Sequence, residues 1–237
     1  MIYLVLLFSM IPLYPAPAGS LRWRGKLATA DRRAQERVRR REEILQAARA
    51  VFAEHGFRRA TIDEVAARAE VGKGTVYLYF SGKEDILAEL LLRALDELGR
   101  RLQAANDDCP VVHPDQRLRA LADAYLTFAH NAPDYFRLLT AFDRGEFVQG
   151  IGPAQREHLL TASNRALELA TQAIADGMAL GIFAPGDARQ AAGVLWAALN
   201  GALTLMAHPL RRTLIATDAV GLCRAALEVC LRGLAKS

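Results

Sequence analysis

The sequence predicts an all-α protein in which one long helix joins a small N-terminal three-helix unit to a larger helical unit. Hydrophobic residues make up 52% of the 237-residue chain, and they lie in Ala- and Leu-rich stretches with few β-branched runs. Within these stretches apolar residues recur three and four positions apart, which is the spacing of one helix face. The length suffices for one small and one medium domain with an ample core.

Charge is distributed unevenly along the chain. Residues 1–83 hold 15 Lys and Arg against 8 Asp and Glu, whereas residues 84–237 hold 15 against 18. The first part therefore has a net charge of +7 and the second a net charge of −3. A basic N-terminal third beside a mildly acidic body indicates one end that faces nucleic acid.

The first twenty residues form an apolar, proline-containing leader that superficially resembles a secretion signal. No Lys or Arg precedes the apolar run, and Pro12 interrupts it before it is long enough to span a bilayer. We therefore expect a mis-assigned start codon, with translation beginning between Met10 and the arginine-rich segment. A disordered or weakly membrane-touching leader is the alternative.

A strongly basic segment follows over residues 21–41 and ends in Arg39, Arg40 and Arg41. It either lies along DNA phosphates or in the minor groove, or it is a solvated extension of the next helix. We expect residues 1–37 to be a leader and basic arm that is disordered or follows from the mis-assigned start.

The first packed helix is expected over residues 42–55, where apolar residues form a single stripe. Gly56 follows, as is typical of a glycine that ends a helix. Thr61 and, three residues later, Glu64 make a capping box, which predicts a second helix from Ile62.

A tight turn at residues 70–72 leads into a helix expected over residues 73–79, with Val76 and Phe80 facing inward. Its outward face carries small, basic and hydroxyl-bearing residues, namely Lys73, Gly74, Thr75 and Tyr77. Such a surface is suited to a DNA major groove.

Residues 61–80, TIDEVAARAEVGKGTVYLYF, resemble the helix-turn-helix of TetR-type transcriptional regulators, and the likeness extends over residues 41–91. Glu70 stands where the family prefers Gly, and Gly72 where the family prefers a Ser cap. Gly still caps acceptably, whereas Glu70 costs roughly 1 kcal/mol if the turn takes a positive φ.

The resemblance implies a DNA-binding domain over residues 38–98 and a ligand-binding and dimerisation domain over residues 99–237. The second motif helix of each subunit would enter one major groove of a palindromic operator. Base edges or nearby phosphates would be met by Lys73, Gly74, Thr75 and Tyr77. The DNA backbone would be held by Thr61, Tyr79 and Lys83.

The stretch from Ser81 to Glu84 is a second capping-box pattern, which predicts a helix from Ser81 to about Gln103. As the only rigid connection between the two halves, this helix would have to carry any signal between them. A ligand in the body would tilt it and change the distance between the two recognition helices of a dimer.

Five more helices are expected after a linker at residues 106–114; they span residues 115–130, 133–144, 154–180, 187–208 and 218–235. The last two are too apolar for helices with one solvated side, so each must be buried on more than one side. Two copies of this pair would form a four-helix bundle, making the protein a homodimer with Leu227 at its interface.

An aromatic set in the body suggests a cavity for a small apolar molecule. Its candidate lining residues are Tyr125, Phe128, Phe136, Phe142, Trp196 and Asn200. Trp196 and Asn200 are favoured, since they lie one turn apart on one helix. The alternative is that these aromatic residues simply fill the core.

The sequence contains no nucleotide-binding glycine motif, metal-ligand spacing or nucleophile elbow. We therefore expect no enzyme activity, no cofactor and no metal. Three scattered cysteines, Cys109, Cys223 and Cys230, are expected as buried apolar thiols in a reducing compartment.

These observations predict a cytoplasmic, sequence-specific DNA-binding transcriptional regulator: a homodimeric repressor that a small apolar ligand releases from its operator. One alternative is a secreted or membrane-associated helical protein, if the leader is a real signal. Another is an α-helical enzyme that uses the aromatic pocket. Neither alternative accounts for residues 61–80.

Overall fold

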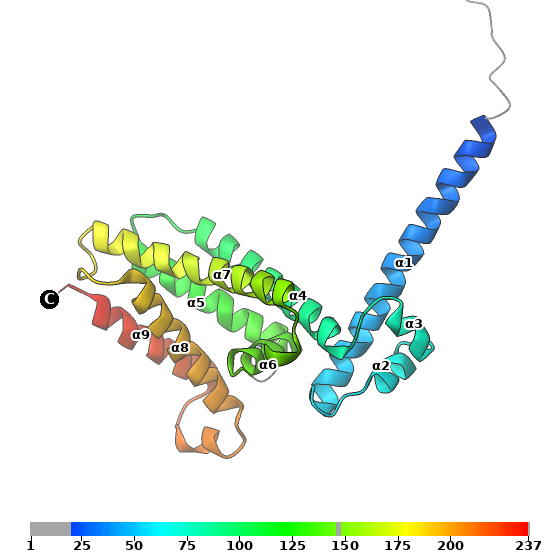
Figure 1. The fold of residues 1–237 in the computed structure, drawn as a ribbon. Coiled ribbons are helices and arrows are strands. Elements are labelled where there is room, and N and C mark those ends of the chain that lie inside the picture. Colours follow the sequence, from blue (N-terminus) through cyan, green and yellow to red (C-terminus); the bar gives the residue numbers. More distant parts are fainter. Residues whose placement is uncertain (1–19, 146–147, 237) are drawn as a thin grey trace, which may run out of the picture. The chain divides into compact units, whose positions relative to one another are not determined.

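The computed structural model describes the backbone of residues 20–145 and 148–236 (Figure 1), with side chains from Asp31 onward except at residue 148. The predictions about the leader, including its start codon and its possible role as a signal, lie outside the described residues. The chain divides into two compact units, Met1–Ile44 and Leu45–Ser237.

The first unit contains the N-terminal part of helix α1, which runs from Ser20 to His55. The expectation of a disordered arm up to residue 37 is wrong for residues 20–37, which belong to this helix. Arg39 donates to Glu36 at 2.8 Å and Arg40 pairs with Glu43 at 2.8 Å. Pairs three residues apart share a helix face and support exposed helix of this kind.

The second unit begins with a helix-turn-helix. The end of α1 is followed by Gly56 in the left-handed conformation, φ 75°, as expected for a helix-ending glycine. Helix α2 spans Ile62–Arg68 and helix α3 spans Lys73–Tyr77. Helix α3 is two residues shorter than expected, because Leu78 caps it and the chain then turns toward the next helix.

Helix α4, Lys83–Asp107, connects this motif to the body. The predicted capping box at Ser81 is absent, because the N-cap is Gly82 and no side chain caps the helix. The Ser81 backbone N–H instead donates to Oδ2 of Asp85 at 3.0 Å. The carboxylate one residue beyond the expected Glu84 therefore holds the residue that precedes the N-cap.

The body consists of helices α5 (Pro114–Asn131), α6 (Pro133–Asp143), α7 (Pro153–Ala179), α8 (Ala188–Ala207) and α9 (Ala219–Leu234), with short 3-10 turns η1 (Val148–Gly150) and η2 (Arg211–Leu214). Each long helix begins and ends within one residue of its predicted bounds. In the described part of the chain, β structure is limited to an isolated bridge between Phe183 and Ala235. The all-α prediction is confirmed.

Helix α4 packs against α5, α6 and α7, while α8 lies between α7 and α9. Arg117 of α5 is the buried charged residue of the described chain, and it ties three helices together. Its guanidinium donates to Asn106 at 2.8 Å and to Asp176 at 2.5 Å. Pairing of this kind offsets the cost of burying a charge.

Helix α8 is long and apolar enough to cross a membrane by length and composition, the one such helix among the described residues. In the fold it packs against α7 and α9 and supplies residues to an internal cavity. Its apolar composition is therefore partly explained by these contacts.

Candidate DNA-binding surface and ligand cavity

The helix-turn-helix rests on the capping box that the sequence predicts. The Glu64 N–H donates to Thr61 Oγ1 at 3.2 Å, and the Thr61 N–H donates back to the Glu64 carboxylate at 2.8 Å. These bonds from Thr61 lower the pKa of Glu64. Val76 and Phe80 are buried as expected, with 0% and 2% of their surface exposed. The motif thus has a fixed core that positions α3.

The outer surface of α3 carries most of the residues predicted to face DNA. Lys73, Gly74 and Tyr77 are exposed, whereas Thr75 is half-buried. Nothing lies within 4 Å of the position that a Cβ on Gly74 would take. The backbone of α3 is therefore open to close approach by another molecule.

Leu78 belongs to this surface but was not predicted. Its side chain is 74% exposed and it lies directly after the end of α3. An apolar side chain at a groove can contact the methyl group of thymine. Its position next to Tyr77 in the motif could have identified it from the sequence as a residue of this surface.

Lys73 bridges the two motif helices. Its Nζ lies 2.8 Å from Oδ2 of Asp63 on α2, and this bond raises the pKa of Lys73. Both side chains are more than half exposed, so the ion pair is weak in water. Lys73 can exchange this partner for a DNA phosphate or base at little cost.

The turn between α2 and α3 contains Glu70 at φ 55°, the one non-glycine residue with positive φ among those described. A positive φ was considered for this turn because Glu70 stands where the family prefers Gly. L-residues other than glycine lose roughly 1–2 kcal/mol there. The turn is kept because Val71 N–H donates to Ala66 O at 3.0 Å and Glu70 N–H donates to Ala67 O at 3.2 Å.

Lys83 lies differently from the phosphate contact that the resemblance implies. Its ammonium donates to the carbonyl oxygens of Phe57, Arg58 and Ala60 at 3.2, 3.3 and 3.3 Å. It also lies 4.8 Å from the centre of the Phe57 ring. Because an ammonium has three donors, the turn after α1 occupies all of them.

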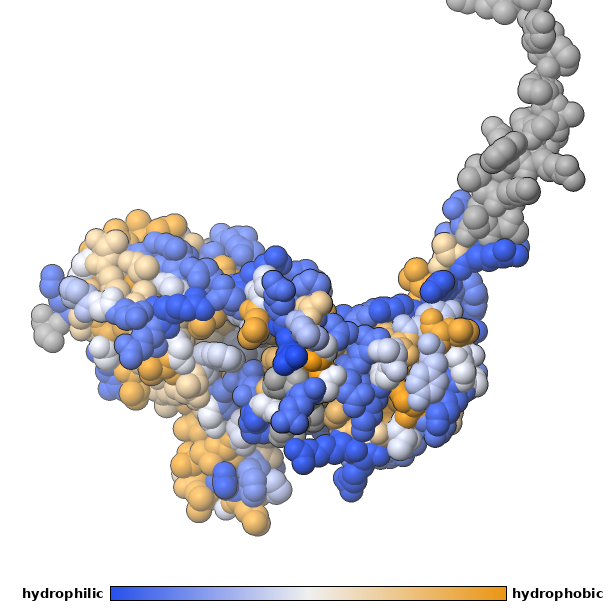
Figure 2. Space-filling view, in the orientation of Figure 1, coloured by the Kyte–Doolittle hydropathy of each residue, from blue (hydrophilic) through white to orange (hydrophobic). Residues whose placement is uncertain are grey.

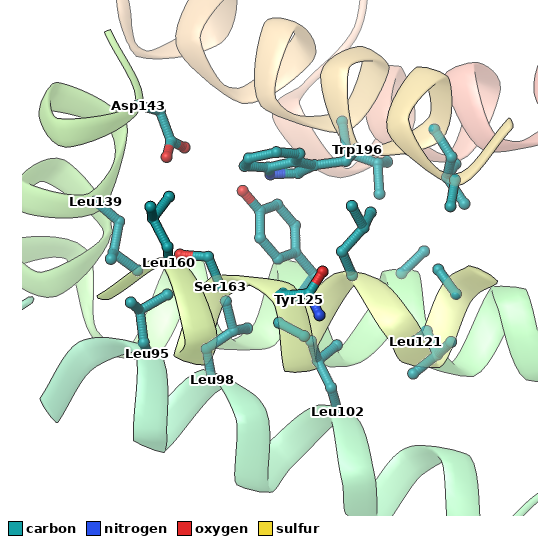
Figure 3. A pocket seen from close by; sticks show the side chains of 18 of the residues that line it. Leu95, Leu98, Leu102, Leu121, Tyr125, Leu139, Asp143, Leu160, Ser163 and Trp196 are labelled. Atoms are coloured by element: carbon teal, nitrogen blue, oxygen red, sulfur yellow. The ribbon is translucent and has the colours of Figure 1, made fainter. Parts of the chain in front are cut away.

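A cavity of 660 Å³ that is partly open to solvent lies in the body, lined by residues of α4, α5, α6, α7 and α8 (Figure 3). Leucines line much of it, with Leu95, Leu98 and Leu102 contributed by α4. Polar groups come from Asp143, Ser163, Asn164 and Arg189. An apolar cavity with a few polar groups is typical of a small-molecule site.

The six predicted lining residues divide into three groups. Tyr125, Phe142 and Trp196 line the cavity. Phe128 is 0% exposed and Phe136 packs edge-on against Tyr125, with ring centres 5.9 Å apart, so these two residues belong to the surrounding core. The remaining residue, Asn200, is not part of the lining but accepts a hydrogen bond from Tyr125, which is.

A short chain of hydrogen bonds orders one end of the cavity. The Tyr125 hydroxyl donates to Asn200 Oδ1 at 2.7 Å, and Asn200 Nδ2 donates to Asp143 Oδ2 at 3.1 Å. Burial, reinforced by the charge of Asp143, raises the pKa of Tyr125, so the phenol keeps its proton. Burial also raises the pKa of Asp143. Sequence reasoning missed Asp143 because nothing in its spacing shows that α6 ends at the cavity.

Helix α4 is not the only connection between the motif and the body, which corrects the sequence-based expectation. Asp85 accepts a hydrogen bond from Gln155 Nε2, on α7, at 2.6 Å. The guanidinium of Arg49, on α1, lies 5.1 Å from the centre of the Tyr135 ring on α6. A displacement of α6 can therefore reach α1 without passing through α4, whereas a displacement of α7 acts on the first turn of α4.

Exposed apolar residues remain on the last two helices and the segment between them. Val194 on α8 and Val229 on α9 are 58% and 63% exposed. Figure 2 shows apolar surface over the segment around η2, where Leu210 and Leu214 are each 76% exposed. Leu227, by contrast, is 5% exposed within the single chain, so its expected place at a dimer interface is wrong.

The cysteines are free in the structure. Cys223 is buried under α8, and burial raises its pKa to about 11. Cys109 and Cys230 are half-buried. Within the described ranges, no group of three or more His, Cys, Asp or Glu could hold a metal ion.

Two regions of the chain match known protein families. Residues 44–90 match the family described as bacterial regulatory proteins, tetR family, and residues 118–228 match the family described as tetracyclin repressor-like, C-terminal domain. The first covers α2, α3 and the flanking helices, and the second covers the helices around the cavity.

Curated relatives agree with this assignment. The HTH-type transcriptional activator FasR of Mycolicibacterium smegmatis is 32% identical over 127 residues, which is 52% of each chain. The HTH-type transcriptional repressor KstR2 of Mycobacterium tuberculosis is 30% identical over 145 residues, 58% of this chain and 72% of KstR2. The match thus spans about half the length of FasR and nearly three quarters of KstR2.

Solved structures share the fold. FadR of Bacillus subtilis in complex with stearoyl-CoA has a TM-score of 0.66 at 20% identity, over 81% of this chain and 98% of FadR. The ketosteroid regulator KstR2 of M. tuberculosis has a TM-score of 0.64 at 22% identity, over 84% and 96%. With both halves matched in sequence and the fold shared along most of its length, the chain belongs to the TetR family of bacterial regulatory proteins.

Proposed function

We propose that the protein is a sequence-specific DNA-binding transcriptional regulator: a cytoplasmic repressor that binds a palindromic operator as a homodimer and leaves it when an apolar ligand enters the cavity. The observation that carries the proposal is the exposed surface of α3. Its Gly74 leaves the backbone open, and Lys73 and Tyr77 project beside it. A helix with this surface, held by a fixed second helix, is suited to a major groove.

Within this surface we assign different tasks to different residues. Gly74, Thr75, Tyr77 and the additional Leu78 meet base edges, where sequence is distinguished. Lys73 lies beside them and meets a base edge or a nearby phosphate. Thr61 and Tyr79 hold the sugar-phosphate backbone. On the first unit, Arg39, Arg40 and Arg41 are proposed as a separate source of positive charge toward phosphates. Lys83 positions the motif through its carbonyl bonds instead of contacting phosphate.

The homodimer is proposed to form through α8 and α9. Among the exposed residues of α8 are Val194, Ala197, Gly201 and Thr204, spaced three and four apart, so they form one face of small residues. Val229 extends an apolar surface on α9. Small residues let helices of two copies approach closely, and a two-fold interface places two recognition helices at a fixed spacing.

Ligand control is proposed to act through α7 as well as α4. Leu160, Ser163 and Leu167 of α7 line the cavity, and Gln155 near the start of α7 bonds Asp85. Asp85 in turn accepts the N–H of Ser81, just beyond the recognition motif. A ligand that displaces α7 would pull on this chain of bonds and reorient the motif.

The test begins with operator selection from random duplex DNA, followed by fluorescence anisotropy on the selected and scrambled duplexes. Gly74→Ala should weaken operator binding at least tenfold, because a methyl group pushes α3 away from the groove. The variant should fold at least as stably as the parent, since alanine favours a helix over glycine by about 0.5–1 kcal/mol.

Gly99→Ala is the matched control. Gly99 is also helical with nothing within 4 Å of its added Cβ, but it lies on α4, away from the motif. This change should leave operator affinity within about twofold. Equal binding by the two variants would show that α3 does not enter the groove. Failure to select any operator would refute the proposed function itself.

A further inference from the structure

The polar end of the cavity presents an acid among aromatic rings. Asp143 lies at this end with Tyr125, Phe142 and Trp196, all of which line the same space. Figure 3 shows the Tyr125 hydroxyl pointing into the gap between Asp143 and Trp196. An acidic group beside the faces of aromatic rings is the combination that attracts an organic cation.

The charge of Asp143 has no opposite charge bonded to it. Its Oδ2 accepts from Asn200 at 3.1 Å, and in the described part of the chain it forms no salt bridge. Asn200 has already used its carbonyl oxygen to accept from Tyr125. Oδ1 of Asp143, a residue of the cavity lining that is also exposed to solvent, therefore remains available as an acceptor.

The cation that lines the cavity is at a distance from this end. Arg189 begins α8 and pairs with Glu168 at 3.3 Å, and it also donates to Asn164. It precedes Asn200 by eleven residues on α8, which corresponds to about 16 Å along the helix. The charge of Arg189 is thus matched by Glu168. Asp143, whose pKa is raised by burial and lowered in part by the nearby charge of Arg144, forms a salt bridge with neither arginine in the described part of the chain.

We infer that the cavity takes an apolar molecule with a protonated amine, the amine binding Asp143 and the aromatic rings while the apolar body lies among the leucines. Fatty acids are excluded from this orientation because their carboxylate would face Asp143. The inference rests on the proposed function only in so far as the bound molecule acts as the effector. Binding itself can be measured without DNA.

The experiment compares three probes with the same chain length: decylamine, decanol and decanoate, each below its micelle-forming concentration. Isothermal titration calorimetry on the full chain should show the tightest binding for decylamine and the weakest for decanoate. Asp143→Asn should lower the affinity for decylamine at least tenfold and change that for decanol less than about twofold. The amide keeps an oxygen to accept from Asn200, so the cavity should retain its shape.

Glu157→Gln is the matched control, since Glu157 is an exposed acid on α7 outside the cavity. It should leave the affinities for all three probes unchanged. Decanoate binding as tightly as decylamine, an unchanged affinity in Asp143→Asn, or no binding of decylamine would each overturn the inference.

Operator release is measured separately and distinguishes the two proposals. Decylamine that binds through Asp143 without releasing operator DNA would leave the inference standing and refute ligand control by this cavity. Release by decanoate but not by decylamine would have the opposite meaning. In that case the regulator would respond to ligand, but the amine assignment would be wrong.

Discussion

Lys83 offers the sharpest choice between a structural role and a DNA contact. If it holds the turn after α1, replacing it by methionine, which keeps the apolar stem, should destabilise the fold. The change removes three bonds to carbonyls at 3.2–3.3 Å and an ammonium that lies 4.8 Å from the ring centre of Phe57. Bonds to a charged donor contribute about 1.5–3 kcal/mol each at good geometry, and these are at the long end of the usual range.

We therefore assign about 2 kcal/mol to the three bonds together and about 0.5 kcal/mol to the interaction with the ring. For a chain of this length each kcal/mol lowers Tm by about 2–4 °C, so Lys83→Met should lower Tm by roughly 5–10 °C. Thermal unfolding followed by circular dichroism measures this shift. The salt dependence of operator binding should stay unchanged, because Lys83 neutralises no phosphate in this arrangement.

Lys73→Met is the matched control, because Lys73 makes an exposed ion pair with Asp63. Its Tm should change little, while the slope of log K against log salt should fall by about 0.9 for each phosphate that the side chain no longer neutralises. The reasoning is refuted if Lys83→Met keeps its Tm and lowers the salt slope as Lys73→Met does. Lys83 would then bind a phosphate, as the family resemblance implies.

Three further predictions follow from individual contacts. Glu70→Gly should raise stability by about 1 kcal/mol by relieving the positive φ, whereas Glu70→Ala should not; chemical denaturation separates the two. Gln155→Ala should accelerate hydrogen exchange at the start of α4. Gln172→Ala removes a side-chain hydrogen bond to Asp176 elsewhere on α7 and should leave that exchange unchanged. Val229→Glu should give folded monomers in light scattering, whereas Leu227→Ala should lower the free energy of unfolding by about 2–5 kcal/mol; a dimeric Val229→Glu would place the interface elsewhere.

The motif was predictable because its determinants are local. Thr61 and Glu64 are three residues apart, so their capping bonds follow from helix geometry. The inward positions of Val76 and Phe80 follow from periodicity. The positive φ of Glu70 follows from its place in the turn, where the family prefers Gly. Each of these inferences needs only neighbouring residues and helix spacing.

The side chains whose surroundings differ from those expected depend on contacts between distant segments. Lys83 bonds carbonyls more than twenty residues earlier, and no pattern in the motif distinguishes this from a phosphate contact. Leu227 has the apolar spacing of an interface residue, but α8 of the same chain covers it. Asp143 enters the cavity because α6 ends there, which requires the arrangement of five helices.

The contacts at the start of α4 also bear on how a ligand signal would travel. Leu98 of the cavity follows Asp85 by thirteen residues on α4, which is about 20 Å of helix. A tilt of about 5° about Leu98 would therefore move Asp85 by roughly 2 Å.

The 2.6 Å bond between Gln155 and Asp85 cannot stretch that far, so it must either break or draw α7 along. Both results replace one discrete set of contacts by another, and such a junction switches between two arrangements instead of bending gradually. Because Asp85 also accepts the N–H of Ser81 at 3.0 Å, the proposed ligand control would orient the motif through whichever arrangement the bound cavity favours.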